Sequence, residues 1–287
     1  VQTGYVRNYG FEAMLSYGHR WGDFGWDSSF TFSANKNEIV ELVKDYVHPE
    51  TGKTYNVDKL ELKTDEGRGF GKAKFILKEG GTLGDLYTHA DLKRDINGNV
   101  LIDDSGNVTA IDNAGDIKLG SVLPKANLAW NNSFSYKGIN AGFLLTARLG
   151  GIVYSATQAY LDLYGVSETS AAARDAGGVW INGRSRVNPQ SFYEVVASQS
   201  GLPTYYTYSA TNLRLQEAHI GYTVPRRWLG NVCDINVSLV GRNLWMIYCK
   251  APFDPEAVAT TNNYYQGIDY FMMPSTRNIG FNIKINF

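Results

Sequence analysis

Residues 278–287 read N-I-G-F-N-I-K-I-N-F, and this stretch decides the fold. Its isoleucine and phenylalanine side chains occupy every second position, while asparagine, glycine and lysine fill the positions between them. Such period-two alternation is typical of a β-strand with one apolar and one hydrophilic face. We therefore predict a long strand whose two faces meet different environments.

The same alternation recurs along the chain and predicts seven long strands. They are expected near residues 3–20, 25–42, 123–136, 139–157, 208–224, 233–248 and 272–287, with a β-bulge near Glu217 where the phase slips. Strands of soluble proteins average about five or six residues, whereas a tilted membrane strand needs about ten. The predicted fold class is all-β, an antiparallel transmembrane β-barrel. A soluble β-sandwich or lectin-like domain is the alternative.

Short and long connections alternate between the predicted strands. The short ones are residues 21–24, 137–138 and 225–232, and the long ones are roughly 43–122, 158–207 and 249–271. Outer-membrane barrels have short periplasmic turns and longer extracellular loops. We interpret residues 43–122 as a long extracellular or lumen-directed elaboration. Two additional spanning strands within this region remain an open alternative.

Composition excludes several other classes of protein. No run of about 18 apolar residues exists, so we predict no transmembrane helix. The net charge of −1 argues against nucleic acid as a partner. Cys233 and Cys249 fall at opposite ends of one predicted strand, which is too long for a disulfide between them. An odd number of strands would leave open edges in lipid, so we expect further strands outside this sequence.

Several short motifs follow one another in the order found in a known family. They are Asn8-Tyr9-Gly10-Phe11-Glu12, Asn35-Lys36-Asn37-Glu38-Ile39, residues 79–87, Leu123-Pro124-Lys125, Tyr136-Lys137-Gly138, Asn212-Leu213-Arg214-Leu215, Gly221-Tyr222-Thr223-Val224-Pro225, Gly241-Arg242-Asn243-Leu244 and Phe253-Asp254-Pro255-Glu256. Together they resemble the SusC/RagA family of TonB-dependent outer-membrane transporters. Residues 79–87 depart from the family pattern, since they lack its proline and have Leu86 where phenylalanine is usual.

This resemblance implies both a location and a function. It implies that residues 1–287 are the C-terminal part of a barrel of about 22 strands, with the plug domain and the N-terminal barrel absent. It also implies import of a bulky nutrient, a glycan, oligosaccharide or peptide, across the outer membrane of a Gram-negative bacterium. The implied partners are TonB, which would act through the missing N-terminal region, and a SusD-like surface lipoprotein. A passive porin or an adhesive structural barrel is the alternative.

Aromatic residues of the predicted extracellular loops are the candidate ligand contacts, because aromatic faces stack on sugars and on peptide side chains. These residues are Trp180, Tyr205, Tyr206, Tyr264 and Tyr265. The charged residues expected to face the lumen are Arg148, Arg214, Arg242 and Lys284. We expect them to form structural ion-pair networks, with a translocation path as the alternative.

Catalytic and metal sites are not predicted. His19, His48, His89 and His219 are scattered and lack metal-ligand spacing. The stretch from Asp95 to Asp104 has the glycine of a calcium loop two places too early, so hairpin turns are favoured over a calcium site. The pairs Gly150-Gly151 and Gly177-Gly178 are interpreted as flexible loop residues, because no helix is expected after either pair. We expect no enzyme activity and no cofactor.

Overall fold

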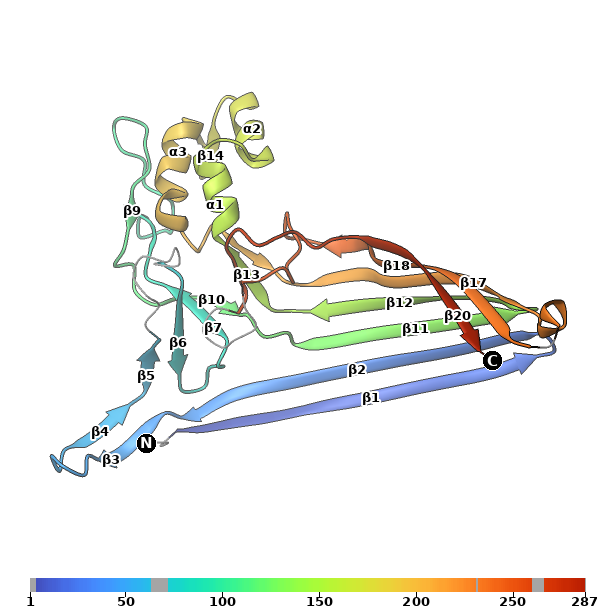
Figure 1. The fold of residues 1–287 in the computed structure, drawn as a ribbon. Helices are drawn as coiled ribbons and strands as arrows, with labels where there is room; N and C mark the ends of the chain where they lie inside the picture. The colour runs from blue at the N-terminus through green and yellow to red at the C-terminus, as the bar shows by residue number, and fades with distance from the viewer. Residues whose placement is uncertain (1–3, 63–71, 231, 260–265, 287) are drawn as a thin grey trace.

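The computed structural model describes residues 4–62, 72–230, 232–259 and 266–286. An antiparallel seven-stranded sheet dominates it, with the strand order β1-β2-β11-β12-β17-β18-β20 (Figure 1). Its strands are β1 (Tyr5–Trp21), β2 (Phe24–Glu41), β11 (Ala126–Tyr136), β12 (Ile139–Leu149), β17 (Asn212–Val224), β18 (Asp234–Cys249) and β20 (Asn278–Asn286). These are the seven strands predicted from the alternation.

The register places the alternating apolar side chains of all seven strands on one face. One row of paired residues crosses the whole sheet as Ile283, Val237, Tyr222, Ile139, Tyr136, Phe24 and Trp21. The neighbouring row is Asn282, Ser238, Gly221, Asn140, Ser135, Gly25 and Arg20. Because successive side chains of a strand point to opposite faces, the sheet has one apolar face and one polar face.

Strand boundaries differ most from the prediction at three places. β12 ends at Leu149, because Gly150 and Gly151 adopt φ values of +77° and +82° that turn the chain away from the sheet. β17 begins at Asn212 and β20 at Asn278, each later than predicted. The bulge near Glu217 is confirmed, since Leu144 pairs with Glu217 while Leu145 pairs with Leu215.

The three short connections lie at the same end of the sheet (Figure 1). Lys137 and Gly138 join β11 to β12 with φ values of +46° and +87°, the conformation of a type I′ hairpin turn. Gly22 has a φ of +61° in the turn between β1 and β2. The 3₁₀ helix η2 (Arg226–Leu229) lies between β17 and β18. The opposite end of the sheet carries the long connections.

The first long connection folds into small sheets of its own. Its elements are β3 (Val43–Val47), β4 (Thr54–Val57), β5 (Lys59–Glu61), β6 (Lys74–Lys78), β7 (Asp85–Thr88), β8 (Asp91–Leu92), β9 (Ala110–Ile111) and β10 (Ile117–Ser121). A four-stranded sheet has the order β10-β7-β6-β5, while β3 pairs with β4 and β8 pairs with β9. Within the described residues of this connection, every strand therefore belongs to a sheet other than the seven-stranded one.

The second long connection contains helices, which the alternation in the sequence does not predict. Its elements are β13 (Ile152–Ser155), α1 (Ala156–Leu163), α2 (Glu168–Asp175), β14 (Val179–Ile181), β15 (Ser185–Val187), α3 (Pro189–Val196), η1 (Ser198–Ser200) and β16 (Thr207–Ser209). In the third long connection, β19 (Ile268–Asp269) pairs in parallel with β13. Among the described residues, none of the helices is long and apolar enough to cross a membrane.

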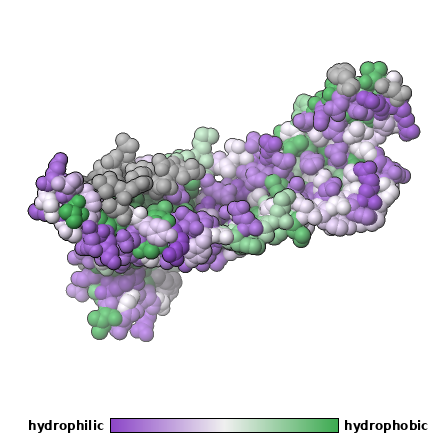
Figure 2. All heavy atoms as spheres, turned by 90° about the horizontal axis from the view of Figure 1, so that it is seen from below, coloured by the Kyte–Doolittle hydropathy of each residue, from purple (hydrophilic) through white to green (hydrophobic). Residues whose placement is uncertain are grey.

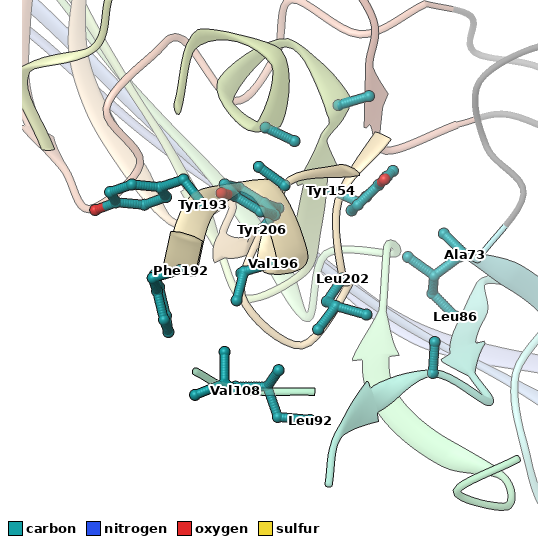
Figure 3. Packing of buried hydrophobic residues seen from close by; sticks show 14 of the residues in the cluster. Ala73, Leu86, Leu92, Val108, Tyr154, Phe192, Tyr193, Val196, Leu202 and Tyr206 are labelled. Carbon is teal, nitrogen blue, oxygen red and sulfur yellow. The ribbon is translucent and has the colours of Figure 1, made fainter. Parts of the chain in front are cut away.

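The hydrophobic core lies among the long connections rather than on the sheet. Tyr154, Leu202 and Leu86 are fully buried in one cluster to which all three connections contribute (Figure 3). By contrast, the apolar face of the sheet is open, with Phe281 exposed at 78% and Leu15 at 74%. Figure 2 shows a green hydrophobic patch along the elongated body and mostly purple, hydrophilic side chains at the loop end.

Candidate functional site

The three helices of the second long connection are fixed by N-terminal caps. Ser155, Ser167 and Asn188 accept backbone N–H bonds at the starts of α1, α2 and α3. α3 also has proline at its first turn, where the missing N–H costs nothing. These short helices pack on the strands below them through the buried cluster of Figure 3. We call α1, α2, α3 and the β14–β15 hairpin the helical cap.

A buried carboxylate links α1 to the start of α2 and to Tyr206. Asp162 is 4% exposed and accepts hydrogen bonds from Gln158 Nε2 at 2.9 Å, from Tyr206 Oη at 3.0 Å and from Ser167 Oγ. Burial, followed by the charge of Asp162 and the bond to it, raises the pKa of Tyr206. The phenol therefore stays protonated at neutral pH and remains a donor to Asp162.

The aromatic residues proposed as ligand contacts occupy different environments. Tyr206 is 2% exposed and lies in the buried cluster, so its side chain is not presented to solvent. Tyr205 packs against Phe192 with ring centroids 6.0 Å apart and is partly buried. Trp180 lies on β14 and is 55% exposed. Tyr264 and Tyr265 lie outside the described residues. Of the three candidates that the structure describes, Trp180 is therefore the one whose side chain is exposed to solvent.

The four charged residues expected to face the lumen share the polar face of the sheet. Arg214 is 4% exposed, and its Nη2 lies 2.6 Å from Asp254 Oδ1 and 3.3 Å from Glu256 Oε2. This ion pair joins the third long connection to β17. Arg242 pairs with Glu217 at 3.1 Å near the surface. The other two residues are Arg148, whose Nη2 donates to the Val122 carbonyl at 2.8 Å, and Lys284, which is exposed on β20.

Two adjoining hollows lie where the polar face meets the long connections. The larger has a volume of about 810 Å³ and is lined by Arg148, Glu256, Glu12 and neighbouring threonine, serine and amide side chains. The second, of about 640 Å³, also borders Glu12 and extends to Lys125. Their linings combine both signs of charge and neutral donors and acceptors with apolar side chains such as Met14, Phe32 and Ile152.

The hairpin turns favoured for the stretch that begins at Asp95 are present, with bridges between Arg94 and Val100 and between Ile102 and Val108. The Asp95 Oδ1 atom accepts the backbone N–H groups of Asn97 and Asn99, and Asp103 closes the next turn in the same way. Hydrogen bonds from the side chain and backbone of Asn99 lower the pKa of Asp95. These carboxylates act as turn acceptors, and the described residues hold no group of three or more His, Cys, Asp or Glu suited to a metal.

Known proteins that are similar to this chain include two receptors and one transporter of known structure. The chain is 25% identical to TonB-dependent receptor P3 of Formosa agariphila over 91% of its length, and 25% identical to TonB-dependent receptor P26 of that organism over 99%. The structure of the RagAB peptide transporter superposes on 99% of the chain with a TM-score of 0.67 and 17% identity. The fold is that of a TonB-dependent transporter β-barrel. No family model matches the chain.

These matches confirm the resemblance to SusC/RagA-type TonB-dependent transporters drawn from the ordered motifs. The chain spans 27% of receptor P3, 29% of receptor P26 and 30% of the RagAB chain. It therefore corresponds to less than a third of each relative. The relatives are receptors and transporters.

Three features of the structure are absent from the sequence predictions. The helical cap was not expected, although the N-cap residues Ser155 and Ser167 and the Asn188-Pro189 pair are signals that could have found it. The partnership of Arg214 with Asp254 joins residues far apart in sequence and left no local signal. Arg186 lies opposite Trp180 because β14 pairs with β15, and the sequence does not predict this hairpin.

Proposed function

We propose that this chain forms part of an outer-membrane importer of a bulky nutrient, with energy supplied through TonB. The observation that carries the proposal is the continuous apolar face across all seven strands, combined with a folded loop assembly at one end. Exposed phenylalanine, leucine and isoleucine on a regular sheet are stable against lipid, where every backbone group must find a partner within the sheet. The polar face would then border the lumen.

We also propose which end of the sheet faces the outside of the cell. Short turns at one end and the long connections at the other match the periplasmic and extracellular sides of outer-membrane barrels. We place the helical cap and the first long connection, residues 43–122, on the extracellular side. There the cap would meet the nutrient before it enters the hollows of the polar face, and we propose Trp180, which is 55% exposed, as a contact residue.

Partners and substrate follow from the relatives as proposals. RagAB is described as a peptide transporter, and its two-part name supports pairing with a surface lipoprotein of the SusD type. We propose that such a lipoprotein lies over the loop end of the sheet. Both glycans and peptides fit hollows whose linings mix polar and apolar side chains. TonB would act through a region of the full-length protein that these residues do not include.

Uptake assays on the full-length protein test the proposal. A deletion strain is compared with the complemented strain for uptake of fluorescently labelled oligosaccharide and peptide fractions, in the presence and absence of TonB. We expect uptake of one fraction to require both the transporter and TonB, and to stop when a protonophore collapses the membrane potential. Uptake that continues without TonB indicates a passive porin, and uptake of every fraction by the deletion strain contradicts import by this protein.

A further inference from the structure

The β14–β15 hairpin presents one apolar and one open face. Val179 pairs with Val187 and Ile181 pairs with Ser185, and the side chains of Ile181 and Val187 are 6% and 1% exposed. Between these pairs, Trp180 lies directly opposite Arg186. Because side chains alternate along a strand, the burial of Ile181 and Val187 turns Trp180 and Arg186 outward together.

A second hairpin holds this one in position. The side-chain Nδ2 of Asn182 donates to the Val100 carbonyl at 2.8 Å, and its Oδ1 accepts the Val100 N–H at 3.0 Å. Asn182 adopts a φ of +53°, a conformation that costs free energy for any residue other than glycine. Val100 is itself 7% exposed and belongs to the buried cluster. The turn between β14 and β15 is therefore anchored to the core.

The open face combines an aromatic surface with uncompensated positive charge. The guanidinium carbon of Arg186 lies 4.4 Å from the ring centroid of Trp180, well inside the range of a cation–π contact. Arg184 lies in the turn and is exposed as well. Within the part of the chain that the structure describes, neither arginine forms an ion pair with a carboxylate. Trp180 nevertheless keeps 55% of its surface open.

We infer that Trp180 and Arg186, with Arg184 in the adjoining turn, form a contact platform for an anionic glycan. The indole offers a flat apolar surface to the apolar face of a sugar ring. The guanidinium groups offer planar, forked donors that match the oxygens of a carboxylate or another oxyanion on that ring. The anchored turn keeps both groups in one geometry before the ligand arrives, which lowers the entropy cost of binding. This inference rests on the proposed import function and narrows its substrate class.

An acidic peptide is the competing ligand, and the geometry favours the glycan. The carboxylates of such a peptide are carried on short, flexible side chains, which present no flat apolar surface to an indole. In a uronate or sulfated sugar, the ring and the charged group are joined rigidly. Simultaneous contact of the ring with Trp180 and of the oxyanion with Arg186 then requires no additional ordering of the ligand.

Binding to the purified full-length protein in detergent tests the platform independently of transport. The probes are dextran sulfate and polygalacturonate, with uncharged dextran and poly-L-glutamate for comparison. We expect both anionic glycans to bind at low salt. The substitutions Trp180→Ala and Arg186→Ala should each weaken binding by about tenfold, a change comparable to the loss of one strong contact. Arg186→Lys should retain part of the affinity, because it keeps the charge but loses the fork.

Arg227→Ala is the matched control, since it removes one exposed arginine at the opposite end of the sheet. Equal losses in Arg227→Ala and Arg186→Ala would indicate nonspecific attraction and overturn the inference. Equal binding of dextran, tighter binding of poly-L-glutamate, or unchanged binding by the Trp180 variant would overturn it as well. Thermal unfolding of each variant confirms that the fold is intact. Failure of these binding assays with TonB-dependent uptake preserved would refute the platform and leave the import function standing.

Discussion

At the scale of single residues, Arg214 links a long loop to the sheet. Its guanidinium contacts Asp254 and Glu256 and also donates to Asn243 Oδ1 at 3.2 Å. Both partners of the Arg214–Asp254 pair are largely buried, with side-chain exposures of 5% and 10%. Removing one partner of a buried pair leaves the other charge without compensation, which costs far more than the loss of a surface pair.

We therefore predict that Asp254→Ala lowers the free energy of unfolding of the full-length protein by about 3 kcal/mol. The control is Glu217→Ala, which breaks the exposed pair with Arg242 and should cost less than about 1 kcal/mol. Chemical unfolding in detergent measures both variants. Equal losses in the two variants would mean that burial of the Arg214 pair contributes nothing to stability.

The same pair predicts a dependence of stability on pH. Burial tends to raise the pKa of Asp254, but the hydrogen bond from Arg214 and its other donors outweigh burial and hold the pKa below the ordinary 3.8. A carboxyl with a lowered folded pKa stabilises fully above its unfolded value and loses that contribution as the pH falls through the folded value. We expect the stability difference between wild type and Asp254→Ala to be constant at neutral pH and to shrink below pH 3.8. A difference that persists unchanged in stronger acid would contradict the assignment.

At the scale of elements, the strands were predictable and the helices were not. Alternation in residues 278–287 predicts which face of β20 is apolar, because every second residue of a strand points to the same face. The helices are each eight residues long, too short to show a clear helical period against a background of loop residues. Their caps were the available signal. The placement of Trp180 beside Arg186 depended on the pairing of β14 with β15, which alternation over three residues cannot fix.

β20 offers a test of the two faces with neighbouring residues. We predict that Ile283→Lys, on the apolar face, reduces assembly in the outer membrane, because a lysine facing lipid is destabilising, by up to about 2–4 kcal/mol at the bilayer midplane. Asn282→Lys, on the polar face, should assemble at the wild-type level. The fraction of full-length protein that migrates as a folded, heat-modifiable band measures assembly. The reverse order of the two variants would place the lipid on the opposite face.

At the scale of the whole molecule, the sheet and the loop core use hydrophobic residues in opposite ways. The loop core buries its apolar side chains within the chain, as in a soluble domain. The sheet turns its apolar side chains outward on one face along its whole width. A chain with both arrangements is stable where its sheet meets lipid and its loop end meets water. The two arrangements show which part of the chain meets lipid and which meets water. They do not show on which side of the membrane the loop end lies.

Cysteine labelling of intact cells tests that assignment. In full-length protein with Cys233 and Cys249 replaced by serine, Ile96→Cys introduces a thiol at a fully exposed loop position, and Asp23→Cys introduces one in a short turn. If the long connections are extracellular, a membrane-impermeant maleimide should label the Ile96 variant in intact cells. It should label the Asp23 variant only after the outer membrane is permeabilised, because short turns lie in the periplasm. Labelling of the Asp23 variant alone in intact cells would mean that the short turns are extracellular, which is the reverse of the proposed orientation. The helical cap could then not be the first contact of an incoming nutrient.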